Sequence, residues 1–198
     1  MCKFISAIVM KSGDLICDPE HTDNHEDLMI FANIRDNYLQ LGRFARIEFT
    51  PPDDKDIADV SAWNLHVDED ETPVWFDSVV VRSKMEALAR RMIISDERKL
   101  LLGGCWILVG EANVKTVKSA RIFTMRDSSR VNTMRDSSQV NTMRDSSQVN
   151  TMLDSSQVNM MLDSSQVNTM LDSSRVNTML DSSRVNTMRD SSRVEEKS

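Results

Sequence analysis

The strongest pattern of apolar and polar positions in the chain is a nine-residue repeat over residues 125–194. Each unit reads Met, Arg or Leu, Asp, Ser, Ser, Gln or Arg, Val, Asn, Thr. Met and Val return in every regular unit, whereas the positions between them are mostly polar. More than a third of the 198-residue chain is therefore one small unit repeated in tandem, which is typical of a stacked architecture.

Three conformations compete for this repeat. In an α-helix, nine residues advance by about 900°, so successive Met side chains would face opposite sides. Disorder suits the many Ser and Asp residues, but the regular Met and Val and the absence of Pro and Gly argue against it. In a strand, the second Ser and the Val share one face and the Gln or Arg points outward. We therefore predict a β-solenoid in which two units form one coil of eighteen residues.

Degenerate copies precede the regular units. Residues 119–124 match Ser-Ser-Gln-Val-Asn-Thr position by position, and residues 112–117 fit the same template with Val117 in the Met position. We expect these copies, over residues 108–124, to join the stack to the preceding domain. The predicted solenoid domain is 105–198, with about five coils, and Gly103-Gly104 marks its boundary with a head domain at 1–104.

The head domain shows short alternating segments that predict an α+β fold in the order ββαββα. Asp23 and Glu26 match a capping box at the start of the first helix. In the second helix, Val81, Met85 and Ala89 share one apolar face. The predicted strands are 4–10, 15–17, 43–49 and 62–67, and the predicted helices are 23–36 and 77–94.

Charge and cysteine content narrow the functional classes. The net charge is −7, yet the repeat block is neutral, so the excess acid lies in the head, mainly at 18–27 and 68–77. This balance gives no basic surface for nucleic acid. The three cysteines are widely separated, which favours a reducing compartment. We find no signal peptide or membrane span and expect a soluble, cytoplasmic protein.

The second position of the repeat varies in an ordered way. It is Arg in the outer units and Leu in four central ones, namely Leu153, Leu162, Leu171 and Leu180. If this position faces outward, the Leu side chains form an apolar patch for a protein partner or for self-association into a homo-oligomer. Alternatively, they pack under a neighbouring loop or at a wider corner. The Asp row would stack like charges, which requires Arg or a cation beside it.

Other candidate sites are weaker. Cys17, His21 and His25 are spaced like ligands along a helix face and are of the types that zinc prefers, but Pro19 interrupts the helix and a fourth ligand is missing. We expect His25 to be exposed in the first helical turn. Calcium-binding rolls need Gly in their turns, and an ice-binding Thr row would be interrupted at Met160. No catalytic motif and no cofactor site is predicted, so an enzyme is not expected.

Three segments carry a resemblance: residues 3–14, residues 22–28 and the Asp-Ser-Ser-x-Val tail. Together they resemble uncharacterised bacterial and prophage proteins that join a short α+β head to Ser-x-Val units. The resemblance implies no catalytic residue. We predict a non-enzymatic binding or assembly protein whose solenoid is a rigid arm or interaction surface. The alternatives are a phage-type inhibitor that mimics nucleic acid through its acidic head, and a metal- or ice-binding solenoid.

Overall fold

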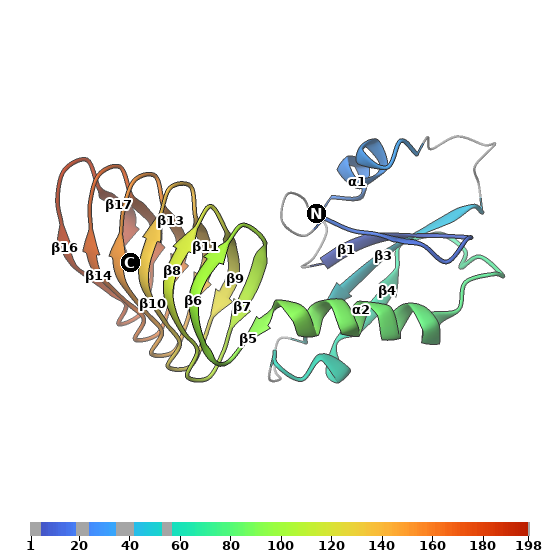
Figure 1. Cartoon of the computed structure of the whole chain (residues 1–198), viewed down its shortest axis with the longest axis horizontal. Coiled ribbons are helices and arrows are strands. Elements are labelled where there is room, and N and C mark those ends of the chain that lie inside the picture. The colour runs from blue at the N-terminus through green and yellow to red at the C-terminus, as the bar shows by residue number, and fades with distance from the viewer. Residues whose placement is uncertain (1–4, 19–23, 35–41, 53–56, 198) are drawn as a thin grey trace. The chain divides into compact units, whose positions relative to one another are not determined.

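The computed structural model describes residues 5–18, 24–34, 42–52 and 57–197. It divides into two compact units, 1–91 and 92–198. The N-terminal unit is a small region of mixed strands and helices, and the C-terminal unit is a β-solenoid (Figure 1). Each unit is described by itself.

The N-terminal unit contains one antiparallel sheet of four strands in the order β2-β1-β3-β4. Gly13, with a φ of +89°, turns the chain between β1 and β2, as the Lys-Ser-Gly-Asp sequence predicts. The strands are β1 (Ile5–Met10), β2 (Leu15–Ile16), β3 (Phe44–Thr50) and β4 (Asn64–Val67).

Two α-helices accompany this sheet, α1 (His25–Phe31) and α2 (Ser78–Met92), and a 3-10 helix (Val60–Ala62) precedes β4. The first helix is capped by Asn24, whose side chain accepts a hydrogen bond from the Glu26 N–H. The expected cap, Asp23, lies outside the described residues. The Asp77 side chain accepts hydrogen bonds from the N–H groups of Val79 and Val80 in the first turn of α2, which fixes where that helix begins.

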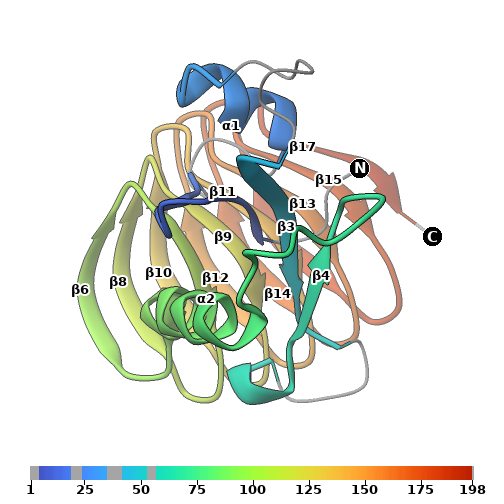
Figure 2. The same ribbon diagram turned by 90° about the vertical axis from the view of Figure 1, so that its right-hand side faces the viewer.

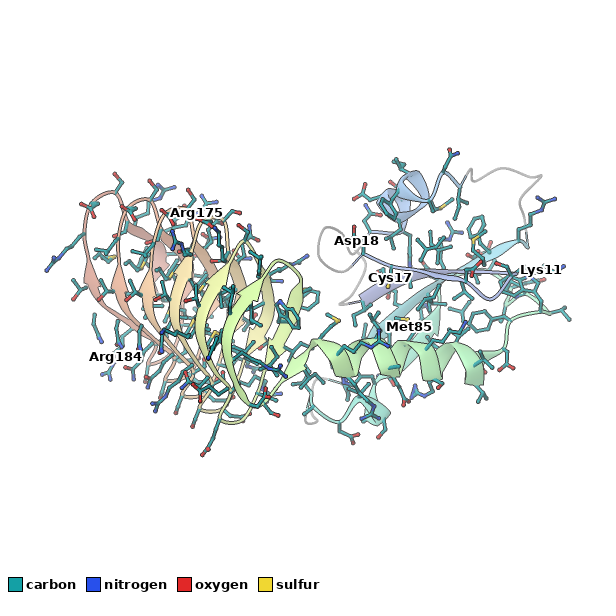
Figure 3. All side chains as sticks on the ribbon, in the orientation of Figure 1. Lys11, Cys17, Asp18, Met85, Arg175 and Arg184 are labelled. Carbon is teal, nitrogen blue, oxygen red and sulfur yellow. The ribbon has the colours of Figure 1, made fainter. Side chains whose placement is uncertain are left out.

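The core of the N-terminal unit forms where the apolar side of the sheet meets α2. Met85 points from α2 toward the sheet (Figure 3) and is fully buried. Phe49 and Trp63 pack with ring centroids 5.3 Å apart, and the Trp63 indole donates to the Ile57 carbonyl. The predicted apolar face of α2 is therefore confirmed at Val81, Met85 and Ala89.

The solenoid consists of two parallel sheets, one with six strands and one with seven, whose strands alternate along the chain (Figures 1 and 2). The six-stranded sheet contains β6 (Glu97–Leu102), β8 (Asn113–Lys118), β10 (Arg130–Arg135), β12 (Gln148–Met152), β14 (Gln166–Met170) and β16 (Arg184–Met188). The seven-stranded sheet contains β5 (Ile93–Ile94), β7 (Cys105–Leu108), β9 (Arg121–Met125), β11 (Gln139–Met143), β13 (Gln157–Met161), β15 (Arg175–Met179) and β17 (Arg193–Lys197).

The strand register confirms that two units form one coil. Val131 pairs with Val149 and Met134 with Met152, so equivalent residues eighteen apart stack directly. The degenerate copies follow the same rule, because Val117 pairs with Met134.

The stack begins earlier in the chain than the repeat indicates. Strands β5 and β6, which lie in the expected head, pair in parallel with β7 and β8. Leu101 occupies an interior position beside Val117 without any Met or Ser of the repeat. Gly103 and Gly104 both have positive φ and form a turn inside a coil. The compact units therefore divide between residues 91 and 92, earlier than the expected boundary at 104/105, and the stack exceeds the expected five coils.

The interior of the regular coils contains three residue types. As far as Ser183, the Met, the Val and the second Ser of each unit are buried, as in Met143, Ser147 and Val149, each with no exposed surface. The outward Asn side chains join neighbouring coils; Asn150 donates to Asn132 and accepts from Asn168. Side-chain ladders of this kind tie successive coils together beyond the strand hydrogen bonds.

Among the described residues, no helix is long and apolar enough to cross a membrane.

Candidate functional site

The variable second position of the repeat lies at the turns, where the chain passes from one sheet to the other. Because two units form one coil, successive units alternate between the two edges of the flattened coil. Backbone hydrogen bonds from Leu162 to Met143 and from Leu153 to Met134 link each turn to the coil before it. The first edge contains Arg126, Arg144, Leu162 and Leu180. The second edge contains Arg135, Leu153, Leu171 and Arg189.

This alternation divides the Leu residues that the sequence grouped into one patch. Leu162 and Leu180 are neighbours on the first edge, and Leu153 and Leu171 are neighbours on the second edge. All four side chains are half-buried. The four Leu residues therefore form two separate pairs. One pair comes directly after strands of the seven-stranded sheet, and the other comes directly after strands of the six-stranded sheet.

Met160 adds an apolar group next to the first edge. It replaces the Thr of the repeat, pairs with Thr142 on one side and Thr178 on the other, and is 38 % exposed. It lies two residues before Leu162, as the last residue of the preceding unit and within strand β13. The sequence marked Met160 only as a break in the Thr row, whereas the register shows that the break coincides with a Leu pair.

An Asp follows the variable residue at every turn of both edges. Each of these residues has a φ between 54° and 58°, the left-handed region that Asp tolerates better than most residues. In six of the eight, one carboxylate oxygen accepts a hydrogen bond from the Asp N–H of the preceding coil. For Asp163 the donor is the N–H of Asp145, at 3.0 Å. This bond partly offsets the repulsion between the stacked Asp carboxylates.

Ion pairs occur along the edges where an Arg or Lys side chain lies close to the Asp row. Arg126 lies 3.7 Å from Asp145 on the first edge. On the second edge, Asp136 lies 3.5 Å from Lys118 and 3.9 Å from Arg135. Within the part of the chain that the structure describes, the Asp residues beside Leu have no such cation: Asp154, Asp163, Asp172 and Asp181. The central edges therefore present carboxylates next to aliphatic side chains.

The two faces of the solenoid are more uniform than its edges. Figure 3 labels Arg175 and Arg184, which belong to the seven-stranded and the six-stranded sheet respectively. Both occupy the Gln or Arg position of the repeat, and Arg175 donates to the Gln157 side chain of the preceding coil. On the six-stranded sheet the Thr residues of the regular units are also stacked in register. This Thr row is the part of the surface that an ice-binding function would use.

A polar pocket of about 350 Å³ lies in the N-terminal unit, on β3 and the segment that follows β4. The Arg46 side chain donates two hydrogen bonds to Glu69, from Nε at 3.0 Å and from a terminal nitrogen at 3.1 Å, and the Arg46 backbone N–H donates a third at 2.9 Å. His66, Asp68 and Asp70 also line this pocket. Because Glu69 is already paired, Asp68 and Asp70 supply most of the negative charge that a basic partner would meet.

His25 is buried, which overturns the expectation that it is exposed. Its Nε2 lies 2.9 Å from the Ile47 carbonyl oxygen and its Nδ1 lies 3.4 Å from an Asp68 carboxylate oxygen. Within the first turn of α1, Glu26 and Asp27 are exposed but His25 faces the sheet, so His25 connects the helix to β3 and to the residue after β4. A sequence pattern that assigns polar residues of the first turn to the surface could not reveal this contact.

Of the suggested zinc ligands, Cys17 and His25 lie among the described residues. His21 lies outside the described residues, and no group of three metal-binding side chains occurs among the residues that are described. Cys17 is half-buried beside Asp18 (Figure 3). Burial, and then the negative charge of Asp18, raise the pKa of the Cys17 thiol above its usual value.

No family model matches the chain, and no curated protein or solved structure is similar to it.

Proposed function

We propose that the chain is a non-enzymatic binding or assembly protein whose solenoid offers a rigid interaction surface at its edges. The observation that carries this proposal is the replacement of Arg by Leu in four consecutive central units, while the interior Met, Ser and Val stay unchanged. The replacement removes a cation from each central turn and leaves an aliphatic group beside an Asp. Partly exposed apolar groups with polar neighbours are typical of protein interaction sites.

Rigidity is the second property that such a surface needs. Every coil is joined to the next through parallel strand pairing on both sheets, and side-chain hydrogen bonds from Asn and Asp add to this pairing. A preordered surface loses little conformational entropy when a partner binds. The N-terminal unit then serves as a second element that docks or recognises, in agreement with a head-and-arm organisation.

The proposal is tested by restoring Arg at the four Leu positions together, as L153R, L162R, L171R and L180R. The outer units already contain Arg at equivalent positions, so the coil accommodates this side chain. We expect loss of self-association in sedimentation experiments, or loss of specific partners in quantitative pull-downs. Unchanged oligomeric state together with unchanged partners would contradict the proposal.

A matched control separates the loss of apolar groups from the added charge. The variant Q139R, Q148R and Q166R adds three Arg charges to the same region of the stack and leaves unchanged Gln157, which accepts a hydrogen bond from Arg175. Arg occurs naturally at the equivalent position of other units, for example at Arg175. We expect this control to keep the association that the Leu variant loses.

A second candidate is an inhibitor that mimics nucleic acid through the acidic N-terminal unit, which the resemblance to prophage proteins would suit. Asp68 and Asp70 line one pocket, and Glu71 and Asp77 follow nearby in the chain. A row of carboxylates can occupy a site built for phosphates. Reversal of Asp70 and Glu71 to Lys tests this function without disturbing the Arg46–Glu69 pair or the Asp77 cap of α2. Loss of a nucleic-acid-binding partner would favour mimicry over assembly through the solenoid edges.

A further inference from the structure

The order of the variable residues along the stack differs between the two edges. Figure 1 shows that the turns of successive coils are stacked in rows, so the order in the chain is also an order in space. Along the first edge it is Arg126, Arg144, Leu162 and Leu180. Along the second edge it is Arg135, Leu153, Leu171 and Arg189. The second order, Arg-Leu-Leu-Arg, reads the same in both directions along the stack, whereas the first does not.

A surface with this symmetry suits a second copy of the same chain. In a two-fold homodimer both copies contribute the same patch, which must therefore match itself. If two stacks lie side by side and antiparallel, Leu153 of one copy faces Leu171 of the other, and both half-buried side chains lose their contact with water. The same arrangement of the four first-edge residues places Leu162 opposite Arg144, which leaves an apolar group beside a charge.

The charges at the two ends of the second edge also favour antiparallel stacks. At one end, Asp136 lies 3.5 Å from Lys118 and 3.9 Å from Arg135, so two cations share one carboxylate. At the other end, Asp190 has no ion pair within the described part of the chain. Antiparallel stacks bring Arg135 of one copy to the level of Asp190 of the other. Parallel stacks would instead bring Lys118 and Arg135 against the same two cations of the other copy.

Arg189 also finds a partner in the antiparallel arrangement. It is exposed and, among the residues that the structure describes, forms no ion pair in its own chain. Asp154, which follows Leu153 on the second edge, likewise has no cation beside it there. In the dimer these two residues of different copies are one coil apart, about 4.8 Å along the stack. An apolar centre within a polar, charged rim is the usual arrangement of protein interfaces.

We propose that the second edge is the interface of a homodimer in which two solenoids lie side by side and antiparallel. This inference rests on the proposed function of the edges and names the partner as a second copy of the chain. The patch spans three coil intervals of about 4.8 Å each. Interfaces of small area are generally weak and transient, so the dimer is reversible and dissociates on dilution.

The interface is tested by analytical ultracentrifugation of the full chain over a series of concentrations. The variant L153R/L171R changes the second edge, and L162R/L180R makes the same change on the first edge as a matched control. Outer units contain Arg at the equivalent positions, so the coil accommodates both variants, which circular dichroism verifies. We expect L153R/L171R to stay monomeric at concentrations at which the wild type dimerises. We expect L162R/L180R to dimerise like the wild type.

The direction of the two stacks is tested by cross-linking. Ser137 and Ser191 are exposed residues on the two outer coils of the second edge. When the variants S137C and S191C are mixed and treated with a short bismaleimide, we expect mass spectrometry to find position 137 of one chain linked to position 191 of another. A link between position 137 of both chains would show parallel stacks and overturn the proposal.

Three results of the ultracentrifugation would also overturn it. If only L162R/L180R loses the dimer, the second edge is not the interface, but the proposed function of the Leu residues is supported. If both variants lose the dimer, the interface is not specific to the second edge. A wild type that is monomeric at every concentration would exclude the homodimer, whereas the pull-down with all four Leu residues replaced would still decide the proposed function separately.

Discussion

Asp145 accepts a hydrogen bond from the backbone N–H of Asp127, one coil earlier, at 3.0 Å. The same carboxylate lies 3.7 Å from Arg126. One side chain therefore satisfies a peptide group of the adjacent turn and also pairs with a cation of that turn. Where Leu replaces Arg, only the bond to the peptide group remains, so the turn keeps its geometry and changes its surface.

The role of Asp in the turns can be tested at Asp163. Replacement by Ala places a side chain with a Cβ but no polar group at a φ of 54° and removes the acceptor for the Asp145 N–H. We expect the free energy of unfolding to fall by about 1–3 kcal/mol. Replacement by Asn keeps an oxygen acceptor and tolerates the same φ, so it should cost clearly less. Urea unfolding followed by circular dichroism measures both, and equal losses would contradict the argument.

The Asn ladders predict a difference between middle and terminal members. Asn150 has one neighbour on each side, whereas Asn186 donates to Asn168 only. At about 1 kcal/mol for each net hydrogen bond, N150A should destabilise about twice as much as N186A. Thermal and urea unfolding of the two variants provide the comparison. A larger effect at Asn186 would show that the ladder bonds do not determine coil stability.

Interior Met residues should be sensitive to truncation. Met152 is fully buried, and M152A should lower the free energy of unfolding by about 2–5 kcal/mol because it leaves a cavity. Met188 occupies the equivalent repeat position two coils later and is 51 % exposed. We expect M188A to remain within about 0.5 kcal/mol of the wild type. The pair thus provides its own control, and similar losses at both positions would argue against a packed core.

Cys17 gives a prediction about reactivity. Burial and the neighbouring Asp18 raise the pKa of its thiol, so less thiolate is present at neutral pH than for an ordinary cysteine. Alkylation of Cys17 by iodoacetamide, followed by mass spectrometry, should be slower than alkylation of a free thiol, and D18N should accelerate it. The direction of this pKa shift also determines how the stability of the folded state depends on pH. Because the folded-state pKa of Cys17 lies above that of an ordinary cysteine, the thiol stabilises the folded state at pH values below its unfolded-state pKa, and this contribution is lost as the pH rises through the folded-state pKa.

The coil could be predicted from the sequence because the buried residues recur at the same positions of every repeat unit. Met, Val and the second Ser recur at fixed spacing, and the eighteen-residue register follows once two strands per coil are assumed. The start of the stack could not be predicted in this way. Strands β5 and β6 supply aliphatic interior residues such as Leu101 without the repeat, because any apolar side chain of suitable size can fill a terminal coil.

The candidate site was predicted less completely than the fold. The sequence identified Leu153 and Leu162 as related, but nine residues correspond to half a coil, so the structure places them on opposite edges. His25 was misjudged for a different reason. Its environment depends on β3 and on Asp68, which are distant in sequence, and local helix patterns contain no information about such contacts.

The in-register pairing of equivalent residues has a consequence for how such a chain can change in length. Removal of eighteen residues from the regular region takes out one whole rung, shortens the stack by about 4.8 Å and returns every remaining side chain to an equivalent neighbour. Removal of nine residues also preserves the interior, but it moves all later strands to the opposite sheet. Any two neighbouring Leu residues that follow the deletion would then lie on the opposite edge of the stack. Gain or loss of whole repeat units can thus change the length and the surface pattern of the solenoid independently of the N-terminal unit.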